Sequence, residues 1–403
     1  MRIALAADTY PPLRTSGAVQ LRDLAEEFRR QGHDVTVMVP APEQCKPWTL
    51  TELNGVPVLR LAAPRTKDIG YIRRTLGEFL MPFAMLRNFR KSPLAQVRWD
   101  GVVWYSPTIF LGPLAGALKQ ANRCRGYLII RDIFPEWAVD IGLMGRGLPY
   151  RLFKAVECYQ YSMADTIGVQ TPANIPYFDA WAKSTERRVE VLQNWLAEAP
   201  NAGTSLTVAD GLLTGRTVFV YAGNMGVAQG MDILLDLAER LRPRRDLGFL
   251  FVGRGCNVPR LKADAEARRL DNVLFRDELE PWEIPGLLAQ CHIGLVALDP
   301  RHQTHNIPGK FLTYLQAGLP VLASINPGND LADLIHREGV GRVCTDHSVD
   351  TLQRLALELA DDPAGWKPAA ARCQALFAQL FSPVTAVQQI VAALMEAPGK
   401  AKG

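Results

Sequence analysis

The chain has 403 residues, 48% of them hydrophobic, and a formal net charge of +4. This length is natural for two domains, and the charge is too small to indicate a nucleic-acid-binding protein. The seven cysteines lie singly, without a Cys-x-x-Cys pair or a Cys/His cluster, so neither a disulfide framework nor a zinc site is predicted. The first apolar run is too short for a signal peptide, and no apolar stretch reaches the length of a membrane span. We therefore expect a cytoplasmic protein.

Short β-branched runs alternate with helical patterns through the first half of the chain. Helices are predicted over 18–31 and 148–163. The predicted strands of this half cover 2–7, 35–39, 56–61, 101–105, 127–132, 166–170 and 189–194. This alternation predicts a parallel sheet with helices on both faces.

The pattern breaks at 197–211, a stretch of small residues and turn formers that we interpret as a linker, and then restarts. The predicted strands of the second half cover 217–223, 247–253, 272–275, 293–298 and 320–324. Ser382-Pro383 is typical of a helix start and predicts a final helix to about Met395. The simplest architecture is two doubly wound α/β domains, 1–200 and 212–381.

Glycine-bearing turns follow several predicted strands, at the end where doubly wound sheets bind their ligands. Ser16-Gly17 begins a long amphipathic helix, and its glycine permits either close approach of a ligand or simply a tight turn. Gly223 and two further glycines surround the exit of the strand over 217–223. That is more glycine than a plain turn requires, which favours a ligand loop.

Two cationic side chains lie at further strand exits. Arg254, between two glycines, is either a diphosphate partner or a solvent-facing turn residue. Pro308, Gly309 and Lys310 begin another predicted helix. Lys310 is either solvated or directed at an anion that is held by the free N–H groups of the helix start. No G-x-G-x-x-G motif is present at the first exit, so a nicotinamide dinucleotide site is not predicted.

Taken in order, these segments resemble a known family over nearly the whole chain. "YPPLRTSGAVQLRDLAEEFRRQGHDVTVMVP", "YAGNMGVAQGMDILLDLAERL" and "KFLTYLQAGLPVLAS" resemble retaining, nucleotide-sugar-dependent glycosyltransferases of family 4. The resemblance implies the GT-B fold, in which two Rossmann-like domains face a cleft, and a C-terminal helix, 382–403, that packs back on the first domain. "RDIFPEWAVDIG" and "GNMGVAQG" are most similar to a subgroup that adds amino sugars such as N-acetylfucosamine in O-antigen and lipopolysaccharide assembly.

The resemblance also implies a donor site. Its predicted residues are Ser16, Gly17, Gly223, Asn224, Gly253, Arg254, Phe275 (within the base-binding segment 273–277), His305, Pro308, Gly309, Lys310 and Thr313. The chain departs from the family pattern at four charged positions. His305 and Thr313 replace two glutamates, and Asn224 and Gln229 replace an arginine and a lysine. We therefore expect Lys310 and Arg254 to supply the positive charge for the diphosphate, together with the dipole of the helix that follows.

Retaining transfer requires stabilisation of the leaving diphosphate and a polar group near the sugar or the acceptor. Asp132, Glu136 and Lys310 are the predicted catalytic residues. The alternative for Asp132 is that it caps the next turn. No Asp-x-Asp pair is present, so we expect no metal and no cofactor, the nucleotide sugar being a substrate.

Residues 60–98 hold nine Lys or Arg and only two acidic side chains, with aromatic residues at roughly helical spacing. This pattern is typical of a helix on an anionic membrane surface, and the alternative is a helix packed on its own sheet. The residues that we select to test membrane binding are Arg73, Arg74, Arg87, Arg90 and Lys91. We expect a peripheral protein on the inner face of the cytoplasmic membrane.

The sequence thus predicts a glycosyltransferase that moves an N-acetylated amino sugar from a UDP-linked donor to a lipid-linked saccharide or lipopolysaccharide acceptor. One alternative is a nucleotide-sugar epimerase of the same fold, against which the basic stretch argues. The other is a binding protein without catalysis, which the four missing charges would permit.

Overall fold

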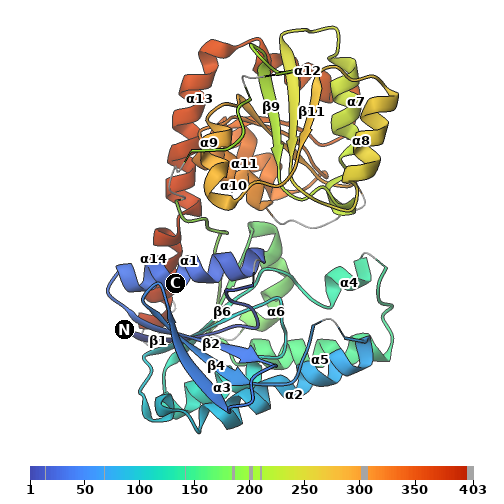
Figure 1. The fold of residues 1–403 in the computed structure, drawn as a ribbon. Coiled ribbons are helices and arrows are strands. Elements are labelled where there is room, and N and C mark those ends of the chain that lie inside the picture. Colours follow the sequence, from blue (N-terminus) through green and yellow to red (C-terminus); the bar gives the residue numbers. More distant parts are fainter. Residues whose placement is uncertain are drawn as a thin grey trace. The chain divides into compact units, whose positions relative to one another are not determined.

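The computed structural model describes residues 1–13, 15–67, 69–140, 142–183, 187–198, 203–208, 211–300 and 307–396. The chain divides into two compact units, Met1–Trp195 with Pro383–Gly403, and Leu196–Ser382. Each unit has one sheet with helices on both faces (Figure 1). The predicted fold class, two doubly wound α/β domains, is confirmed.

The first unit has eight strands in the order β3-β4-β2-β1-β5-β6-β7-β8, and only β3 and β4 pair in the antiparallel direction. These strands are β1 (Arg2–Ala6), β2 (Asp34–Ala41), β3 (Trp48–Leu53), β4 (Val56–Ala62), β5 (Gly101–Tyr105), β6 (Arg125–Ile129), β7 (Thr166–Val169) and β8 (Arg188–Val191). The central strands β1, β5 and β6 are almost entirely buried, because helices cover both faces of the sheet.

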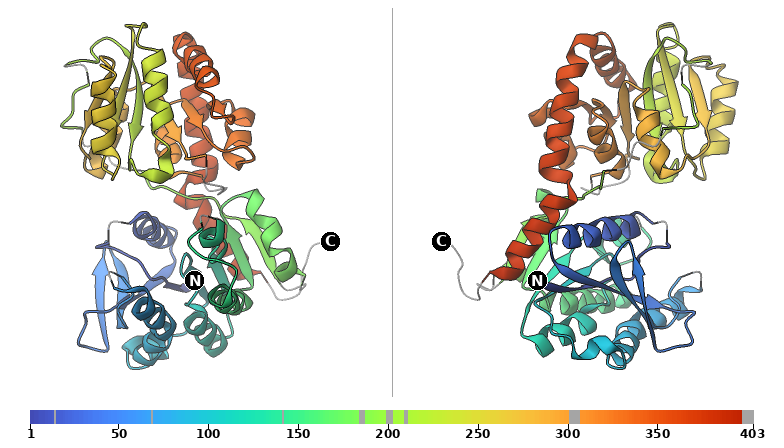
Figure 2. Two further views of the ribbon diagram at one scale, coloured as in Figure 1. Left: turned by 90° about the vertical axis from the view of Figure 1, so that its right-hand side faces the viewer. Right: turned by 60° about the vertical axis from the view of Figure 1, so that its left-hand side comes forward.

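Two helix layers cover this sheet. One layer is α1 (Ser16–Arg30) with α14 (Pro383–Met395), which lie side by side (Figure 2). The other contains α2 (Tyr71–Phe89), α3 (Gly112–Asn122) and α5 (Leu148–Ser162). Short helices in the connections are η1 (Pro93–Gln96), α4 (Glu136–Asp140), η2 (Pro172–Phe178) and α6 (Asp179–Ala182).

A hairpin at the sheet edge is absent from the sequence-based prediction. β3 and β4 are joined by Asn54 and Gly55, both of which have positive φ. An Asn-Gly pair is a strong signal for a two-residue hairpin turn. The preceding strand was overlooked because three of its residues are exposed and its apolar character is weak.

The second unit has six parallel strands in the order β11-β10-β9-β12-β13-β14. These strands are β9 (Thr217–Ala222), β10 (Leu247–Val252), β11 (Val273–Arg276), β12 (Ile293–Ala297), β13 (Val321–Ser324) and β14 (Gly341–Cys344). β9 lies between β10 and β12, so the exits of these three strands are neighbours at one edge of the sheet. The sequence-based prediction omitted β14, which has only four residues.

Helices also cover both faces of the second sheet. One face is covered by α7 (Asp232–Arg240), α8 (Val258–Ala267) and α12 (Val349–Ala360). The other is covered by α9 (Ile284–Leu288), α10 (Gly309–Gln316), α11 (Asp330–Glu338) and α13 (Pro363–Leu376). Two short turns complete the unit, η3 (Val227–Gln229) and η4 (Pro281–Glu283).

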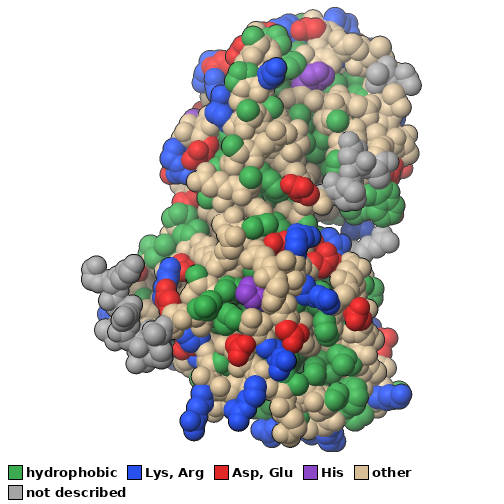
Figure 3. Space-filling view, turned by 90° about the vertical axis from the view of Figure 1, so that its left-hand side faces the viewer, with side chains coloured by type: hydrophobic (Ala, Val, Ile, Leu, Met, Phe, Trp, Pro, Cys, Tyr) green, Lys and Arg blue, Asp and Glu red, His purple; other side chains and the backbone are tan. Residues whose placement is uncertain are grey.

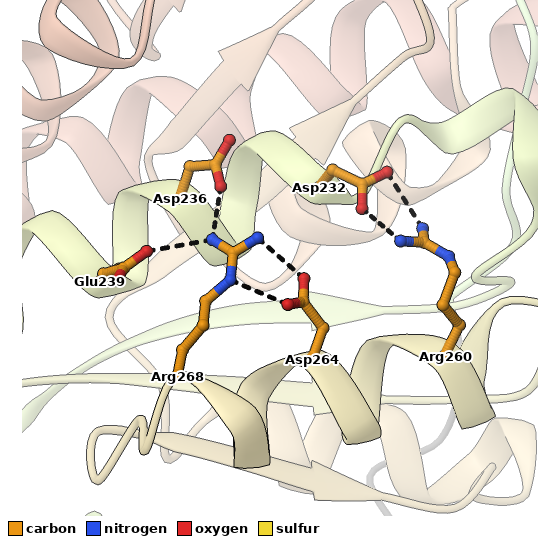
Figure 4. A network of polar contacts seen from close by, with 6 residues as sticks. All are labelled: Asp232, Asp236, Glu239, Arg260, Asp264 and Arg268. Atoms are coloured by element: carbon orange, nitrogen blue, oxygen red, sulfur yellow. Dashed lines mark hydrogen bonds and ion pairs between the residues drawn. The ribbon is translucent and has the colours of Figure 1, made fainter.

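Ion pairs link α7 to α8, the two helices that follow the exits of β9 and β10 (Figure 4). Arg268 contacts Asp236 at 2.6 Å and Asp264 at 2.8 Å, and Arg260 contacts Asp232 at 2.6 Å. Each exposed pair contributes only about 0–1 kcal/mol, but together they fix the spacing of the two helices.

The helical run Pro363–Met395 corrects one sequence-based expectation. By length and composition it could cross a membrane, although no such stretch was expected. Cys373 of α13 is buried in the core of the second unit. So is Phe381, in the π-helical part Phe377–Phe381. Beyond Ser382, Val387 and Ile390 are buried in the first core. The apolar character of the run is thus used by the two cores.

The segment interpreted as a linker is partly packed. The second unit begins at Leu196, directly after Trp195. The Leu196 N–H donates to the Phe381 carbonyl at 3.0 Å. Val208 is buried in the second core, and its N–H donates to Gln290 at 2.9 Å. Much of the described part of 197–211 therefore belongs to the second unit.

Candidate functional site

The exits of β9 and β10 pack backbone against backbone. Gly223 N–H donates to the Val252 carbonyl at 2.9 Å, and Met225 N–H donates to the Arg254 carbonyl at 2.7 Å. A Cβ on Gly253, which has φ of +145°, would lie 2.0 Å from the Gly223 oxygen. Gly253 is therefore required by the contact between the two loops, whether or not it also faces a ligand.

Packing also explains two of the glycines that were interpreted as a ligand loop. A Cβ on Gly230 would lie 2.9 Å from Asp299 Cα, and one on Gly226 would lie 2.9 Å from Asn224 Nδ2. Gly223 differs, because its nearest neighbour would be the Lys310 side chain, at 3.7 Å. The number of glycines at this exit is thus no indication of a ligand, but Gly223 leaves its backbone open towards Lys310.

Lys310, on α10, reaches the exit of β9. Its Nζ lies 4.8 Å from the centroid of the Tyr221 ring. Tyr221 is buried and donates its hydroxyl proton to the Asn224 carbonyl at 2.7 Å, which fixes the ring below the ammonium group. Lys310 is half-buried, and removal from water lowers its pKa to about 8. No ion pair joins Lys310 to a carboxylate among the residues that the structure describes.

The start of α10 is open beside this lysine. Pro308 is the N-cap and Gly309 the first helical residue, and no side chain of the described residues caps the helix. Gly309 is exposed, and no atom of the described residues lies within 4 Å of its ideal Cβ position. Packing therefore does not require a glycine here, in contrast to position 253. Unpaired N–H groups and a desolvated cation together form a favourable place for an anion.

Three further predicted donor residues of the second unit, Asn224, Arg254 and Thr313, have polar partners within the protein. Asn224 donates to Gln229 at 3.1 Å, so two positions that lack the charge of the family pattern bind each other. Arg254 is exposed and pairs with Glu278 at 3.3 Å. Thr313 donates to the Gly309 carbonyl at 3.3 Å, within α10. His305 lies outside the described residues.

Phe275 does not present its ring at the exit of β11. The half-buried ring packs on Phe251 with 5.2 Å between centroids, and it lines a cavity of about 500 Å³ beside α8.

In the first unit, the exits of β1 and β5 converge near Gly17. Thr15 is the N-cap of α1 and accepts from Ala18 N–H, and Ser16 is exposed. A Cβ on Gly17 would lie 3.3 Å from both Thr9 and Tyr105. The glycine therefore has a packing reason, and it brings the helix start close to the Tyr105 hydroxyl.

The exit of β6 holds Arg131 and Asp132. Arg131 is only 7% exposed, donates to the Leu192 carbonyl at 2.8 Å, and lies over the Trp195 ring. It therefore anchors the chain after β8. Asp132 is half-buried, and its charge acts on Arg131 and on Tyr105, whose pKa is raised to about 12, chiefly by burial. Asp132 thus lies at the strand exit, and its predicted role near the sugar or the acceptor stays a prediction.

Glu136 has a structural role that the sequence did not reveal. Its Oε1 accepts from Tyr150 at 2.8 Å and from Lys154 at 2.9 Å, and Lys154 also pairs with the fully buried Glu157 at 2.7 Å. Burial raises the pKa of Glu136, but these partners outweigh it and the net shift is downward. A carboxylate held ionised in this way ties α4 to α5, and its role as a catalytic residue stays a prediction.

The sequence-based prediction missed Asp8, which directly follows β1. Its Oδ1 is buried and has no hydrogen-bond partner among the described residues. Burial raises the pKa of Asp8, while the charges of Lys67 and Arg74 lower it, and the net shift is upward. Both Asp8 and Asp132 act on Tyr105, so they share one edge of the sheet. An acidic residue at a strand exit was the signal in the sequence.

The chain matches two family models. Residues 16–195 match the model described as glycosyl transferase 4-like domain, and residues 216–362 match glycosyl transferases group 1.

Within the described parts of the chain, no group of three or more His, Cys, Asp or Glu side chains is arranged to hold a metal ion.

Two curated relatives are similar in sequence. The putative colanic acid biosynthesis glycosyl transferase WcaI of Escherichia coli K12 is 25% identical over 87% of this chain and 90% of its own length. The probable glycosyltransferase WbjE of Pseudomonas aeruginosa is 24% identical over 60% of this chain. That match spans 62% of WbjE.

Solved structures share the fold. HepE of Anabaena, solved in complex with UDP, has a TM-score of 0.68 and 17% identity over 98% of this chain and 99% of its own. WaaG, described as a glycosyltransferase of lipopolysaccharide biosynthesis, has a TM-score of 0.64 and 16% identity over 98% of this chain and 100% of its own.

Proposed function

Since this chain is a glycosyltransferase with the GT-B fold, we propose that it transfers a sugar from a UDP-linked donor to a lipid-linked saccharide or lipopolysaccharide acceptor, with retention at the anomeric carbon. The observation that carries this proposal is Lys310, desolvated beside the open backbone of Gly223 and the uncapped start of α10. The transferred sugar is an N-acetylated amino sugar, on the resemblance of "RDIFPEWAVDIG" and "GNMGVAQG".

In this proposal, cleavage of the bond between the anomeric carbon and the diphosphate oxygen runs ahead of bond formation to the acceptor. Negative charge therefore builds on the diphosphate. Lys310 and the N–H groups at the start of α10 stabilise that charge. The acceptor hydroxyl attacks from the same face, and its proton passes to a phosphate oxygen of the leaving group. Asp132 and Asp8 bind and orient hydroxyl groups at the edge of the first sheet. The HepE complex supports UDP as the nucleotide, by likeness of fold.

The test is transfer by the purified protein. UDP-N-acetylhexosamines and a polyprenyl-diphosphate saccharide should give an extended lipid product, and NMR should show the donor's anomeric configuration in the product. Because the chain contains no Asp-x-Asp pair, activity should persist in EDTA. Loss on chelation, restored by Mg²⁺, would contradict the metal-free mechanism. Epimerisation without acceptor, or UDP-sugar binding without turnover, would favour the two alternatives.

We also propose that α2 brings the protein to the inner face of the cytoplasmic membrane. Exposed apolar residues follow one side of this helix, and Ile72 is 87% exposed. Arg74 pairs with Glu78, but Arg73, Arg87, Arg90 and Lys91 form no ion pair with any other described residue. Figure 3 shows both Lys/Arg and Asp/Glu side chains over most of one face, with Lys and Arg predominating along its lower edge.

Substitution of Arg73, Arg74, Arg87, Arg90 and Lys91 by Gln should abolish sedimentation with phosphatidylglycerol vesicles at low salt. Each basic group near an anionic surface contributes about 1 kcal/mol, and high salt should reproduce the effect on the wild type. UDP affinity should not change, because these residues lie in the other unit from Lys310. Wild-type protein that stays in the supernatant at low salt would show that α2 is simply a packed helix.

A further inference from the structure

Two helices of the first unit expose apolar side chains that none of the described residues covers. On α2 these include Ile72, Leu76 and Phe83, of which Leu76 is 59% and Phe83 58% exposed. On α5 they include Leu148, which is 80% exposed, and Leu152. α3 contacts both helices, so α2 and α5 flank it on the same face of the sheet. Scattered exposed apolar residues are ordinary, but rows on two flanking helices indicate a binding surface.

A groove lies between these helices. It has a volume of about 280 Å³, and every residue that lines it is apolar or aromatic. Phe79 and Phe83 of α2 form one wall, Val156 and Tyr159 of α5 form the other, and Phe110 lies just before α3. Nothing in this lining can recognise a polar ligand, apart from the Tyr159 hydroxyl. The groove fits a hydrocarbon.

A line of aromatic contacts leads from the groove to the exit of β6. The ring centroids of Phe79 and Phe110 are 5.0 Å apart, those of Phe110 and Phe153 are 6.4 Å apart, and those of Phe153 and Phe134 are 5.2 Å apart. Phe134 is two residues from Asp132, the predicted acceptor-binding residue. These packed rings therefore connect the groove with the exit of β6 within one hydrophobic core.

Charged groups of the same two helices favour an anionic lipid. Arg73 and Arg87 of α2 and Arg151 of α5 are exposed, and no ion pair is found for them among the described residues. The acidic residues of the two helices are engaged, since Glu78 pairs with Arg74 and Glu157 with Lys154. The two helices thus carry both the apolar groove and exposed positive charge that no described carboxylate neutralises.

We propose that the groove between α2 and α5 binds the hydrocarbon chain of the lipid-linked diphosphate acceptor. The first isoprene units lie along Phe83, Phe79 and Phe110, so that the diphosphate and its saccharide emerge at the exit of β6. This inference rests on the proposed transfer to a lipid-linked acceptor and adds where its lipid is held. A phospholipid chain of the bilayer would have no reason to follow the aromatic line to the sheet edge.

Binding of short polyprenyl diphosphates tests this directly. For the wild type, affinity measured by calorimetry should rise by about tenfold or more from geranyl to farnesyl diphosphate, because five more carbons are buried. Inorganic diphosphate should bind most weakly to this unit, and saturating UDP should be present throughout to occupy the other anion site. Equal affinity for geranyl and farnesyl diphosphate would overturn the proposal.

Two exposed residues of α2 provide a matched pair of variants. Phe83→Gln removes a groove wall and should weaken farnesyl diphosphate binding by about tenfold, whereas Leu76→Gln, equally exposed but outside the groove, should leave it unchanged. Ala155→Trp, which should fill the groove, provides a second route to the same loss. Circular dichroism and the melting temperature verify that each variant is folded. Equal effects of Phe83→Gln and Leu76→Gln would overturn the proposal.

Vesicles separate the two sources of hydrocarbon. With phosphatidylglycerol vesicles that lack polyprenyl lipid, Phe83→Gln and Leu76→Gln should lose the same small amount of binding. If Phe83→Gln lost vesicle binding while binding farnesyl diphosphate normally, the groove would hold bilayer lipid and the proposal would fail. UDP-sugar turnover is measured separately with a soluble saccharide acceptor, so absent turnover would refute the proposed function without altering the farnesyl diphosphate result.

Discussion

Replacement of Lys310 by Ala should weaken UDP binding by about 1–3 kcal/mol, which is roughly 5- to 150-fold in the dissociation constant. The ammonium group is held over Tyr221 next to Gly223, with no carboxylate partner among the described residues. A bound diphosphate would replace the interactions with water that the Lys310 ammonium group has lost through burial. Isothermal calorimetry with UDP measures the effect.

Two controls make this result specific. Lys310→Arg keeps the positive charge and should retain most of the affinity. Lys367→Ala removes an exposed lysine of α13 in the same unit, and it should not change UDP binding. Unchanged UDP affinity in Lys310→Ala would eliminate Lys310 as the diphosphate partner.

The same lysine predicts a pH dependence. Burial lowers the pKa of Lys310 to about 8 from the usual value of 10.5, so the free protein loses this charge as the pH rises through about 8. UDP binding should therefore be strongest below pH 8 and should weaken above it, and a bound diphosphate should raise the pKa again. In Lys310→Ala the decrease above pH 8 should be absent.

Gly253→Ala should destabilise the second unit by about 3 kcal/mol or more. Gly253 has φ of +145°, and an added Cβ would lie 2.0 Å from the Gly223 carbonyl oxygen. Backbone strain and overpacking each cost about 1–3 kcal/mol. Here the added Cβ would meet backbone atoms, which cannot move away as a side chain can. Denaturant unfolding followed by tryptophan fluorescence measures the loss.

Gly309→Ala is the matched control, because it also places a methyl group at a glycine of the candidate site. No described atom lies within 4 Å of the added Cβ, and alanine is a better helix former by up to about 1 kcal/mol. The unfolding transition should stay in place or move to higher denaturant. If UDP approaches this backbone, its affinity should fall all the same. A Gly253→Ala protein as stable as the wild type would contradict the tight packing of the two loops.

Several features of this protein were determined by local sequence alone. The strands β1, β5, β9, β10 and β12 are nearly continuous apolar runs, because a parallel sheet covered on both faces buries almost all of their side chains. Helix periodicity between such runs is equally local. The doubly wound architecture of both units, and the glycine-bearing exits that mark one edge of each sheet, could therefore be predicted from sequence.

Tertiary structure decided which side chains meet at those exits. Lys310 lies beside Gly223 because β9 occupies the middle of the sheet and α10 packs against its exit, although 86 residues separate them in the chain. Glu136 is occupied by Lys154, and Gly253 is required by Gly223, for similar reasons. Residue type and spacing predict an element, since its hydrogen bonds are local. The neighbours of a side chain depend on strand order and helix packing, which only the whole folded unit determines.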